Sequence, residues 1–232
     1  MQSIGFLSQF GEAMFDCRED TNDQSAVQSC FVQDEYELIG LELKRGAIAI
    51  DIGAHIGGVT LLLALMGLEV YAYEPIRENH MLLYRNVMRN GMKERVHIFR
   101  QAVTDGEGIV PIYLGWKDKI HYYIGNLYSN TDESQSVETI GLDAVFAQNG
   151  IARCAVMKMD VEGSEFAILK NASKDTLGRI DFICGEYHTV QGPEAMTRKL
   201  LLTTTKELFD DVTEGPDIAG IGHFRFKRQL FL

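Results

Sequence analysis

The 232-residue chain is 46% hydrophobic and 24% charged, which predicts one globular domain of the larger kind with a sizeable core. Its formal charge of −11 argues against binding of long nucleic acids, because neutralising phosphates takes clustered Lys and Arg. The four cysteines show no Cys-x-x-Cys spacing, and no apolar run reaches membrane-spanning length. We therefore expect a cytoplasmic protein with reduced thiols and no transmembrane segment.

Residues 1–45 precede the first core strand, and we expect them to form a flank or lid. This flank should contain a short hairpin near Met14–Arg18 and a helix around Asp34–Leu43. From residue 46 onward strands and helices alternate, which predicts a parallel sheet built from right-handed crossovers. We expect residues 46–232 to form a single domain.

The first strand, Ala47–Ile50, is apolar at every position, as is typical of a parallel strand covered by helices on both faces. It leads into the segment DIGAHIGG at 51–58. The glycines of this segment allow positive φ angles and close approach to a ligand, and the next helix, Val59–Met66, points its first N–H groups into the same crevice. In open α/β sheets, ligands bind in that crevice.

The second strand, Val70–Tyr73, delivers Glu74 to the same edge of the sheet and stops at Pro75. Glu74 lies 23 positions after Asp51, and an acid at about this offset is suited to bind both hydroxyls of a ribose. The alternative is that Glu74 only caps the helix beginning near Ile76. The neighbouring glycine turn favours ribose binding.

The residue at position 55 indicates which of two classes of cofactor the glycine turn can bind. A dinucleotide-binding fingerprint needs a glycine there so that the backbone can approach a pyrophosphate, and this chain has His55. S-adenosylmethionine has no phosphate, so the sequence favours a methyl donor over a dinucleotide. A dinucleotide-dependent oxidoreductase stays as the alternative, and we expect His55 to be a loop residue near the cofactor rather than a catalyst.

The middle of the chain continues the alternation of helices and strands. A helix from about Ile76 should end before Gly91, and a third strand at Val96–Phe99 leads to Gln101 and Ala102 at the ligand edge. An edge-like strand is expected at Ile109–Leu114.

The irregular segment 115–136 then carries four aromatic residues, Trp116, Tyr122, Tyr123 and Tyr128. Because long loops in compact domains are often functional, we expect an acceptor-binding loop with Tyr122 and Tyr123 in contact with substrate.

The last part of the chain should supply two more parallel strands and an edge strand. The expected elements are a helix at Leu142–Gln148, strands at Ala155–Met159 and Ile180–Cys184, a helix from Pro193 to about Phe209, and a final edge strand at Phe224–Phe231.

Polar residues follow the fourth and fifth strands. Asp160 and Glu186 should reach the crevice, and His188 is the natural proton acceptor at neutral pH. Methyl transfer to a hydroxyl requires a base near the oxygen or a metal that lowers the alcohol pKa. We favour His188 as a general base over binding of Mg²⁺ or a similar cation by Asp160, Glu186 and His188, because imidazole is a poor ligand for a hard cation. Glu165 is expected to stabilise a helix N-terminus.

Together these residues resemble the FkbM-type methyltransferases, a group of class I S-adenosylmethionine-dependent enzymes. The resemblance rests on seven segments in order: QDEYEL at 33–38, DIGAHIGG at 51–58, YEPIREN at 73–79 with LLYRNVMRNG at 82–91, QAVTDGEG at 101–108, VETIGLDAVF at 137–146, KMDVEGSE at 158–165 and GEYH at 185–188. His55 departs from the family pattern, in which a small polar residue such as Asn is more usual.

The resemblance implies a Rossmann-like α/β fold with a seven-stranded, mostly parallel sheet, helices on both faces and an antiparallel last strand. It implies O-methylation of a small-molecule acceptor such as a sugar or polyketide, with a non-catalytic binding module as the further alternative. By position, the family roles fall on Asp51, Gly53 and Gly57 at the methionine end, Glu74 at the ribose, Gln101 and Ala102 at the adenine, and Asp160, Glu162, Glu186 and His188 at the reacting centre.

Overall fold

The computed structural model describes residues 1–114, 122–124, 134–188, 209, 211–214 and 221–228. These residues form a mixed α/β structure, as the alternating pattern predicts. The helical segments are α1 (Asp23–Val27), the π-helical turn η1 (Gln28–Val32), α2 (Gly58–Leu65), α3 (Arg77–Arg89), α4 (Leu142–Gln148), α5 (Glu165–Asn171) and α6 (Lys174–Gly178). The strands are β1 (Gln2–Ser8), β2 (Gly11–Cys17), β3 (Ile48–Ile52), β4 (Glu69–Tyr73), β5 (Val96–Phe99), β6 (Ala102–Thr104), β7 (Gly108–Leu114), β8 (Tyr122–Ile124), β9 (Ser134–Gly141), β10 (Val156–Met159), β11 (Phe182–His188), β12 (Asp211–Glu214) and β13 (Ile221–Lys227).

A seven-stranded sheet lies at the centre, in the order β12-β13-β11-β10-β3-β4-β5. The five strands from β11 to β5 run parallel to one another, and β13 runs antiparallel to both of its neighbours. The predicted edge position of the last strand is wrong, because β13 pairs with β11 on one side and β12 on the other. The alternating hydrophobic pattern of β13 arises because Phe224 and Phe226 are buried in the core on one face of the sheet.

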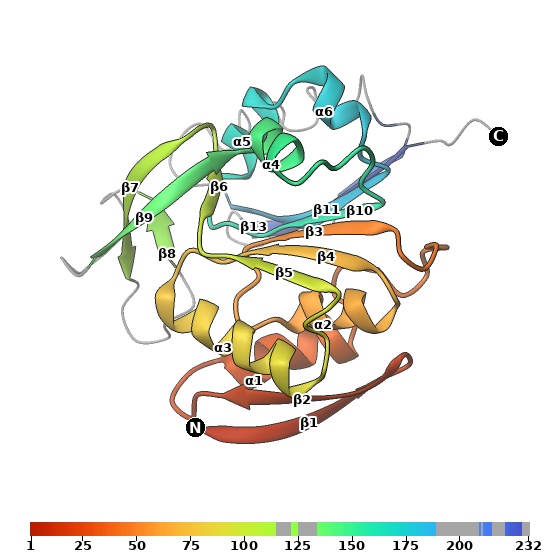
Figure 1. Ribbon diagram of the computed structural model, residues 1–232, viewed down its shortest axis with the longest axis vertical. Coiled ribbons are helices and arrows are strands. Elements are labelled where there is room, and N and C mark those ends of the chain that lie inside the picture. Colours follow the sequence, from red (N-terminus) through yellow and green to blue (C-terminus); the bar gives the residue numbers. More distant parts are fainter. Residues whose placement is uncertain (115–121, 125–133, 189–208, 210, 215–220, 229–232) are drawn as a thin grey trace.

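Helices cover both faces of this sheet, with α2 and α3 on one side and α4, α5 and α6 on the other (Figure 1). Successive side chains of a strand point to opposite faces, so Ala49 enters the core beside α2 whereas Ile50 enters the core beside α4. Both cores are apolar, which explains why the strand before the glycine turn has no polar face. No helix in the described part of the chain is both long and apolar enough to cross a membrane.

A second sheet, in the order β6-β9-β7-β8, extends from the ligand edge of the first. The strand expected at an edge over 109–114 is β7, which pairs with both β9 and β8, so that prediction is wrong. The segment 115–136 is not irregular throughout, because residues 122–124 form β8 and β9 begins at Ser134. Its remaining residues lie outside the described part of the chain.

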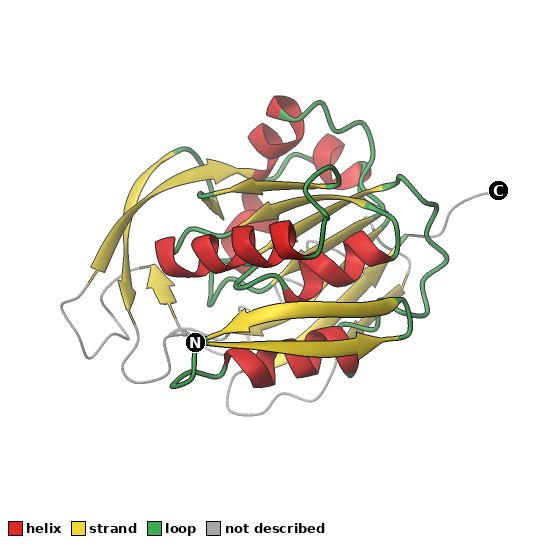
Figure 2. Ribbon diagram, turned by 60° about the horizontal axis from the view of Figure 1, so that its bottom comes forward, coloured by secondary structure: helices red, strands yellow, loops and turns green. Residues whose placement is uncertain are grey.

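The N-terminal flank begins with a hairpin, β1–β2, that is longer than the predicted one and starts earlier. Its inner face carries Phe6 and Phe15, which pack with Phe31 of η1 in edge-to-face pairs. All three rings belong to the core that also contains the α2 face of the central sheet. Figure 2 shows the hairpin lying across the helices on that side. The flank is therefore part of the main core rather than a detached appendage.

The helix expected around Asp34–Leu43 is absent from the structure, and that prediction is wrong. Asp34 and Glu37 have φ angles of 54° and 53°, which a right-handed helix does not allow. The Asp34 carboxylate also accepts hydrogen bonds from the N–H groups of Leu38 and Ile39, at 2.7 and 3.0 Å. Asp competes with helix formation by such local bonds, and here it closes a turn.

Strand β11 extends further than expected, so that Glu186 and His188 lie within it rather than beyond its end. The added pairing partner is β13, whose residues His223 and Ile221 stand opposite Glu186 and His188. The helix expected from Pro193 to about Phe209 lies outside the described residues, apart from Phe209 itself, which is buried.

Candidate active site

A cavity of about 380 Å³ lies at the carboxyl ends of the parallel strands, where the sequence analysis expects a ligand. Its wall contains predicted residues from both ends of the site: Gly53, His55, Glu74, Gln101, Ala102, Asp160, Glu162, Glu186 and His188. The N-terminal flank adds a wall that the sequence analysis did not foresee: Asn22, Ser25, Ser29, Cys30, Glu35 and Tyr36. Of the predicted cofactor residues, Asp51 and Gly57 lie outside this lining.

The glycine turn has the backbone geometry that its sequence predicts. Gly53 has a φ of 77°, and a Cβ on it would clash with the backbone oxygen of Asp160. The two loops that frame the cavity therefore touch at a point where only glycine fits. Gly57 has a φ of 99° and is the N-cap residue of α2, so it starts the helix whose N-terminus faces this edge of the sheet.

Glu74 lines the cavity and caps a helix at the same time. One carboxylate oxygen accepts the N–H of Ile76 at 2.9 Å and the amide of Asn79 at 3.4 Å. The other oxygen accepts the N–H of His55 at 2.9 Å. The hydrogen bonds to Ile76 and Asn79 agree with the capping alternative, and ribose binding stays a prediction, because a carboxylate oxygen can accept more than one hydrogen bond.

Asp51 lies behind the cavity wall and is fully buried. Its carboxylate accepts the hydroxyl of Thr60 at 2.6 Å and lies 3.6 Å from Nζ of Lys158. Lys158 also donates to the backbone oxygen of Gly53 at 2.8 Å and lies 3.8 Å from the carboxylate of Asp160. Burial alone would lower the pKa of Lys158, but Asp160 and Asp51 hold it above its ordinary value. The ammonium group therefore ties β3, the glycine turn and Asp160 together.

His188 stands at the centre of a group of carboxylates. Its Nδ1 lies 3.0 Å from Glu165, and its Nε2 lies 3.5 Å from both Glu162 and Glu186. Burial alone would lower the pKa of His188, but the hydrogen bonds with Glu165 and Glu186 raise it to about 11. The arrangement therefore favours a charged imidazolium at neutral pH, which would have to lose this proton before acting as a base.

Glu162 and Glu165 have different environments despite their proximity. Glu165 accepts the N–H groups of Val161 and Gly163 at 3.1 Å as well as contacting His188, so it organises the loop before α5. In the described part of the chain, one buried carboxylate oxygen of Glu162 makes no hydrogen bond. Burial raises the pKa of Glu162 to about 8, against the attraction of His188.

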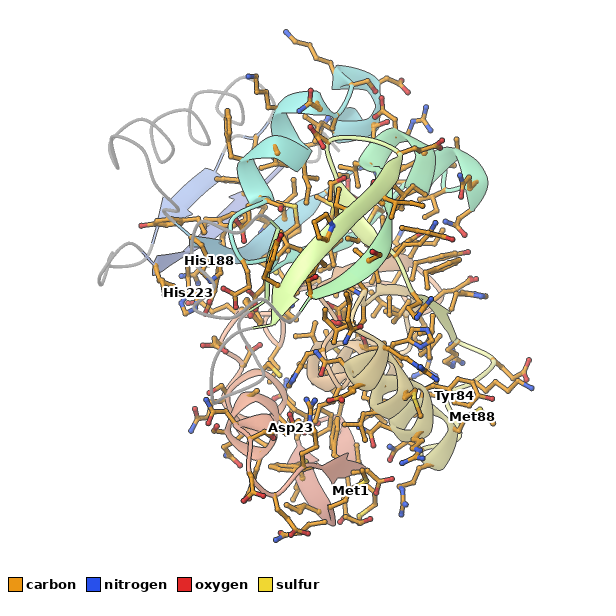
Figure 3. All side chains as sticks on the ribbon, turned by 90° about the vertical axis from the view of Figure 1, so that its left-hand side faces the viewer. Met1, Asp23, Tyr84, Met88, His188 and His223 are labelled. Atoms are coloured by element: carbon orange, nitrogen blue, oxygen red, sulfur yellow. The ribbon has the colours of Figure 1, made fainter. Side chains whose placement is uncertain are left out.

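The flank and the last strand add contacts to the same end of the cavity. Tyr36 donates its hydroxyl to Asp160 at 3.0 Å. His223 lies 2.9 Å from Glu186 and 3.5 Å from Glu35, and these hydrogen bonds raise its pKa to about 10. Figure 3 shows His188 and His223 close together on neighbouring strands.

Sequence reasoning missed Tyr36, Lys158, Glu35 and His223. For Lys158 a signal existed, since it is a charged residue in the otherwise apolar strand β10. The sequence holds no comparable signal for Glu35, Tyr36 and His223. They reach the site only through the turn at Asp34 and the pairing of β13 with β11.

Among the residues that the structure describes, two sets of side chains lie close enough together to share a cation: Asp160, Glu165 and His188, and Glu35, Glu186 and His223. Neither set is the predicted one of Asp160, Glu186 and His188. In each set the histidine lies within 3.0 Å of a carboxylate oxygen of the same set.

The predicted acceptor residues Tyr122 and Tyr123 lie in β8, paired with β7. Their side chains are not among the described atoms. Ile112 of β7 does line the cavity, so the second sheet borders the site.

Comparison with known proteins places this architecture in a family. Residues 51–214 match the family model described as Methyltransferase FkbM domain. The chain is 28% identical to the 31-O-demethyl-FK506 methyltransferase FkbM of Streptomyces tacrolimicus, over 78% of this chain and 77% of that protein. It is also 25% identical to the AMB antimetabolite synthetase AmbE of Pseudomonas aeruginosa, over 69% of this chain but 9% of that much longer protein.

Solved structures share the fold at low sequence identity. The methyltransferase FkbM from Methylobacillus flagellatus superposes with a TM-score of 0.54 at 16% identity, over 82% of this chain and 45% of that chain. This chain therefore spans less than half of that solved protein. A SAM-dependent methyltransferase from Agrobacterium tumefaciens also gives a TM-score of 0.54, at 9% identity over 99% of this chain and 71% of that chain.

Proposed function

Because the chain belongs to the FkbM methyltransferase family, we propose that it transfers a methyl group from S-adenosylmethionine to a hydroxyl oxygen of a small-molecule acceptor. The observation that carries the proposal is one continuous cavity with two chemically different ends. The glycine turn and Glu74 lie at one end, and the cluster of carboxylates around His188 lies at the other.

The residues of the first end fit the cofactor. Glu74 offers buried carboxylate oxygens to the ribose hydroxyls, and Gln101 and Ala102 border the space for the adenine. The turn from Gly53 to His55 and the start of α2 would surround the methionine part. The bound cofactor supplies an electrophilic methyl group on a sulfonium, and the negative charges around the cavity are compatible with that positive charge.

At the second end we propose that Glu162 accepts the proton of the acceptor hydroxyl. Its Oε2 is buried beside the cavity and makes no hydrogen bond among the described residues, and a pKa of about 8 is close to what general base catalysis at physiological pH requires. The imidazolium of His188 would stabilise the ionised form of Glu162, which lies 3.5 Å away. Tyr36 and Lys158 would fix the orientation of Asp160 beside the reacting oxygen.

Two alternatives for activating the hydroxyl remain. His188 could be the general base, or Asp160, Glu186 and His188 could hold a divalent cation. A chelator that abolishes turnover, with recovery on addition of metal, would favour the cation. Full activity in the chelator would favour a protein base.

Two measurements test the function. Calorimetry should show binding of S-adenosylmethionine and none of NAD, since His55 occupies the position that a pyrophosphate-binding glycine would need. A screen of sugars and polyketides should then yield one acceptor that gains the mass of a methyl group while S-adenosylhomocysteine accumulates. A folded protein that binds NAD instead would contradict the proposal, and cofactor binding without product from any acceptor would favour a non-catalytic module.

A further inference from the structure

An ion-pair network joins the N-terminal flank to the glycine turn, and the proposed chemistry does not use it. Asp23, the first residue of α1, is fully buried. Its carboxylate accepts hydrogen bonds from the backbone N–H of Arg18 at 2.8 Å and from the Arg18 guanidinium at 2.8 and 2.9 Å. Burial alone would raise the pKa of Asp23, but hydrogen bonds with His55 and Arg18 hold it well below its usual range. A buried charge is tolerated only with such partners.

This network reaches both oxygens of Glu74. Nε2 of His55 lies 3.3 Å from Asp23 and 3.3 Å from the guanidinium of Arg18, and the backbone N–H of His55 donates to one Glu74 oxygen. The Arg18 guanidinium also donates to the side-chain oxygen of Asn79 at 2.8 Å. The amide nitrogen of Asn79 then donates to the other Glu74 oxygen.

The backbone at His55 adopts a conformation that few side chains adopt. Its φ of 50° lies in the left-handed region, which is uncommon for residues other than glycine, although asparagine, aspartate and histidine occur there more often than the rest. Holding the imidazole between Asp23 and Arg18 stabilises that conformation. It thereby keeps the His55 N–H pointed at Glu74.

We propose that Arg18, Asp23 and His55 form a clamp, by which we mean a set of positioning residues that hold Glu74 and the glycine turn in the geometry that binds S-adenosylmethionine. This inference rests on the proposed function. Two of the three residues precede the matched family region of 51–214, so cofactor binding depends on the flank as well as on the family domain. Figure 3 shows Asp23 well apart from His188 and His223, so the clamp acts on the cofactor end.

The test measures binding of S-adenosylmethionine by calorimetry to the full chain and its variants. Asp23→Asn and His55→Asn should each weaken binding by about tenfold, because a displaced Glu74 loses a charge-assisted hydrogen bond to the ribose. Asparagine at position 55 tolerates a positive φ, so His55→Asn removes the tie without forcing the backbone. The double variant should bind about as weakly as either single variant, because residues acting through one contact are not additive.

Asp16→Asn is the matched control, since Asp16 lies in the same flank and pairs with Arg89 rather than with the cavity. Its affinity for S-adenosylmethionine should equal that of the wild type. If Asp23→Asn does not fold, His55→Asn decides the question. Wild-type affinity in folded Asp23→Asn or His55→Asn, or additive losses in the double variant, would overturn the clamp alone. A folded wild-type protein that does not bind S-adenosylmethionine would overturn the proposed function and the clamp together.

Discussion

At the scale of single residues, Glu74 accepts backbone hydrogen bonds at the edge of the cavity and is the residue that we propose binds the ribose. We predict that Glu74→Gln weakens binding of S-adenosylmethionine by about ten- to a hundredfold, since charged hydrogen bonds contribute about 1.5–3 kcal/mol. The glutamine oxygen can still accept one of the backbone N–H groups that the carboxylate now accepts. Calorimetry measures the affinity, and thermal unfolding measures the fold.

Glu69→Gln provides the comparison, because Glu69 lies at the opposite end of the same strand and contacts His97. It should leave cofactor affinity unchanged. If Glu74→Gln binds the cofactor as tightly as the wild type but melts earlier, Glu74 is a helix cap and no more.

The identity of the base is also a residue-scale question, and the pH dependence of kcat answers it. A base must be ionised, so with Glu162 in this role kcat rises as the pH increases through about 8. With His188 as the base, kcat would rise only through about 11. The charged or polar groups facing Glu162 are His188, Asp160, Glu165 and Glu186.

Replacement of the base should remove most of the turnover. We expect Glu162→Gln to lower kcat by about 10²–10⁴-fold with cofactor affinity retained, which is the usual contribution of a general base. A rise of kcat that persists near pH 8 in Glu162→Gln would show that another group titrates there.

At the scale of elements, the second sheet borders the cavity through β7. β8 pairs with β7, whose Ile112 lines the cavity, so residues 122–124 stay near the site. We predict that Tyr122→Ala and Tyr123→Ala raise KM for the acceptor identified by the screen, with cofactor affinity nearly intact. Steady-state kinetics and calorimetry on the same preparations measure both quantities.

Adjacent residues of a strand face opposite sides, so one of these two substitutions should have the larger effect on KM. Loss of cofactor binding or unfolding in both variants would show that β8 has a structural role only.

At the scale of the whole molecule, the flank and the central sheet share one core. Phe15 is fully buried and packs edge to face against Phe6 and Phe31. We predict that Phe15→Ala lowers the free energy of unfolding by about 3–5 kcal/mol, the usual cost of emptying an aromatic site. Urea denaturation followed by fluorescence and by circular dichroism should still show one cooperative transition.

Leu7→Ala on the same hairpin should change stability by less than about 0.5 kcal/mol, because Leu7 is 71% exposed. Two separated transitions in Phe15→Ala, with the second unchanged from the wild type, would mean that the flank is a separate unit.

The sequence by itself determined the elements whose signals are local. Glycines 53 and 57, the apolar strand before them and the acid at the end of the next strand predicted the cofactor edge, because parallel strands present their carboxyl ends together. Family segments spread from 33 to 188 predicted the methyltransferase family, which the family match confirms.

Only the tertiary structure decided which distant side chains meet. His223 reaches Glu186 because β13 pairs with β11, and Tyr36 reaches Asp160 because Asp34 turns the chain where a helix was expected. The protonation states depend on the same contacts, since three carboxylates around His188 raise its pKa and so favour the charged imidazolium. The order of strands in the sheet joins segments that are far apart in the sequence, and the periodicity within each segment does not specify which of them become neighbours.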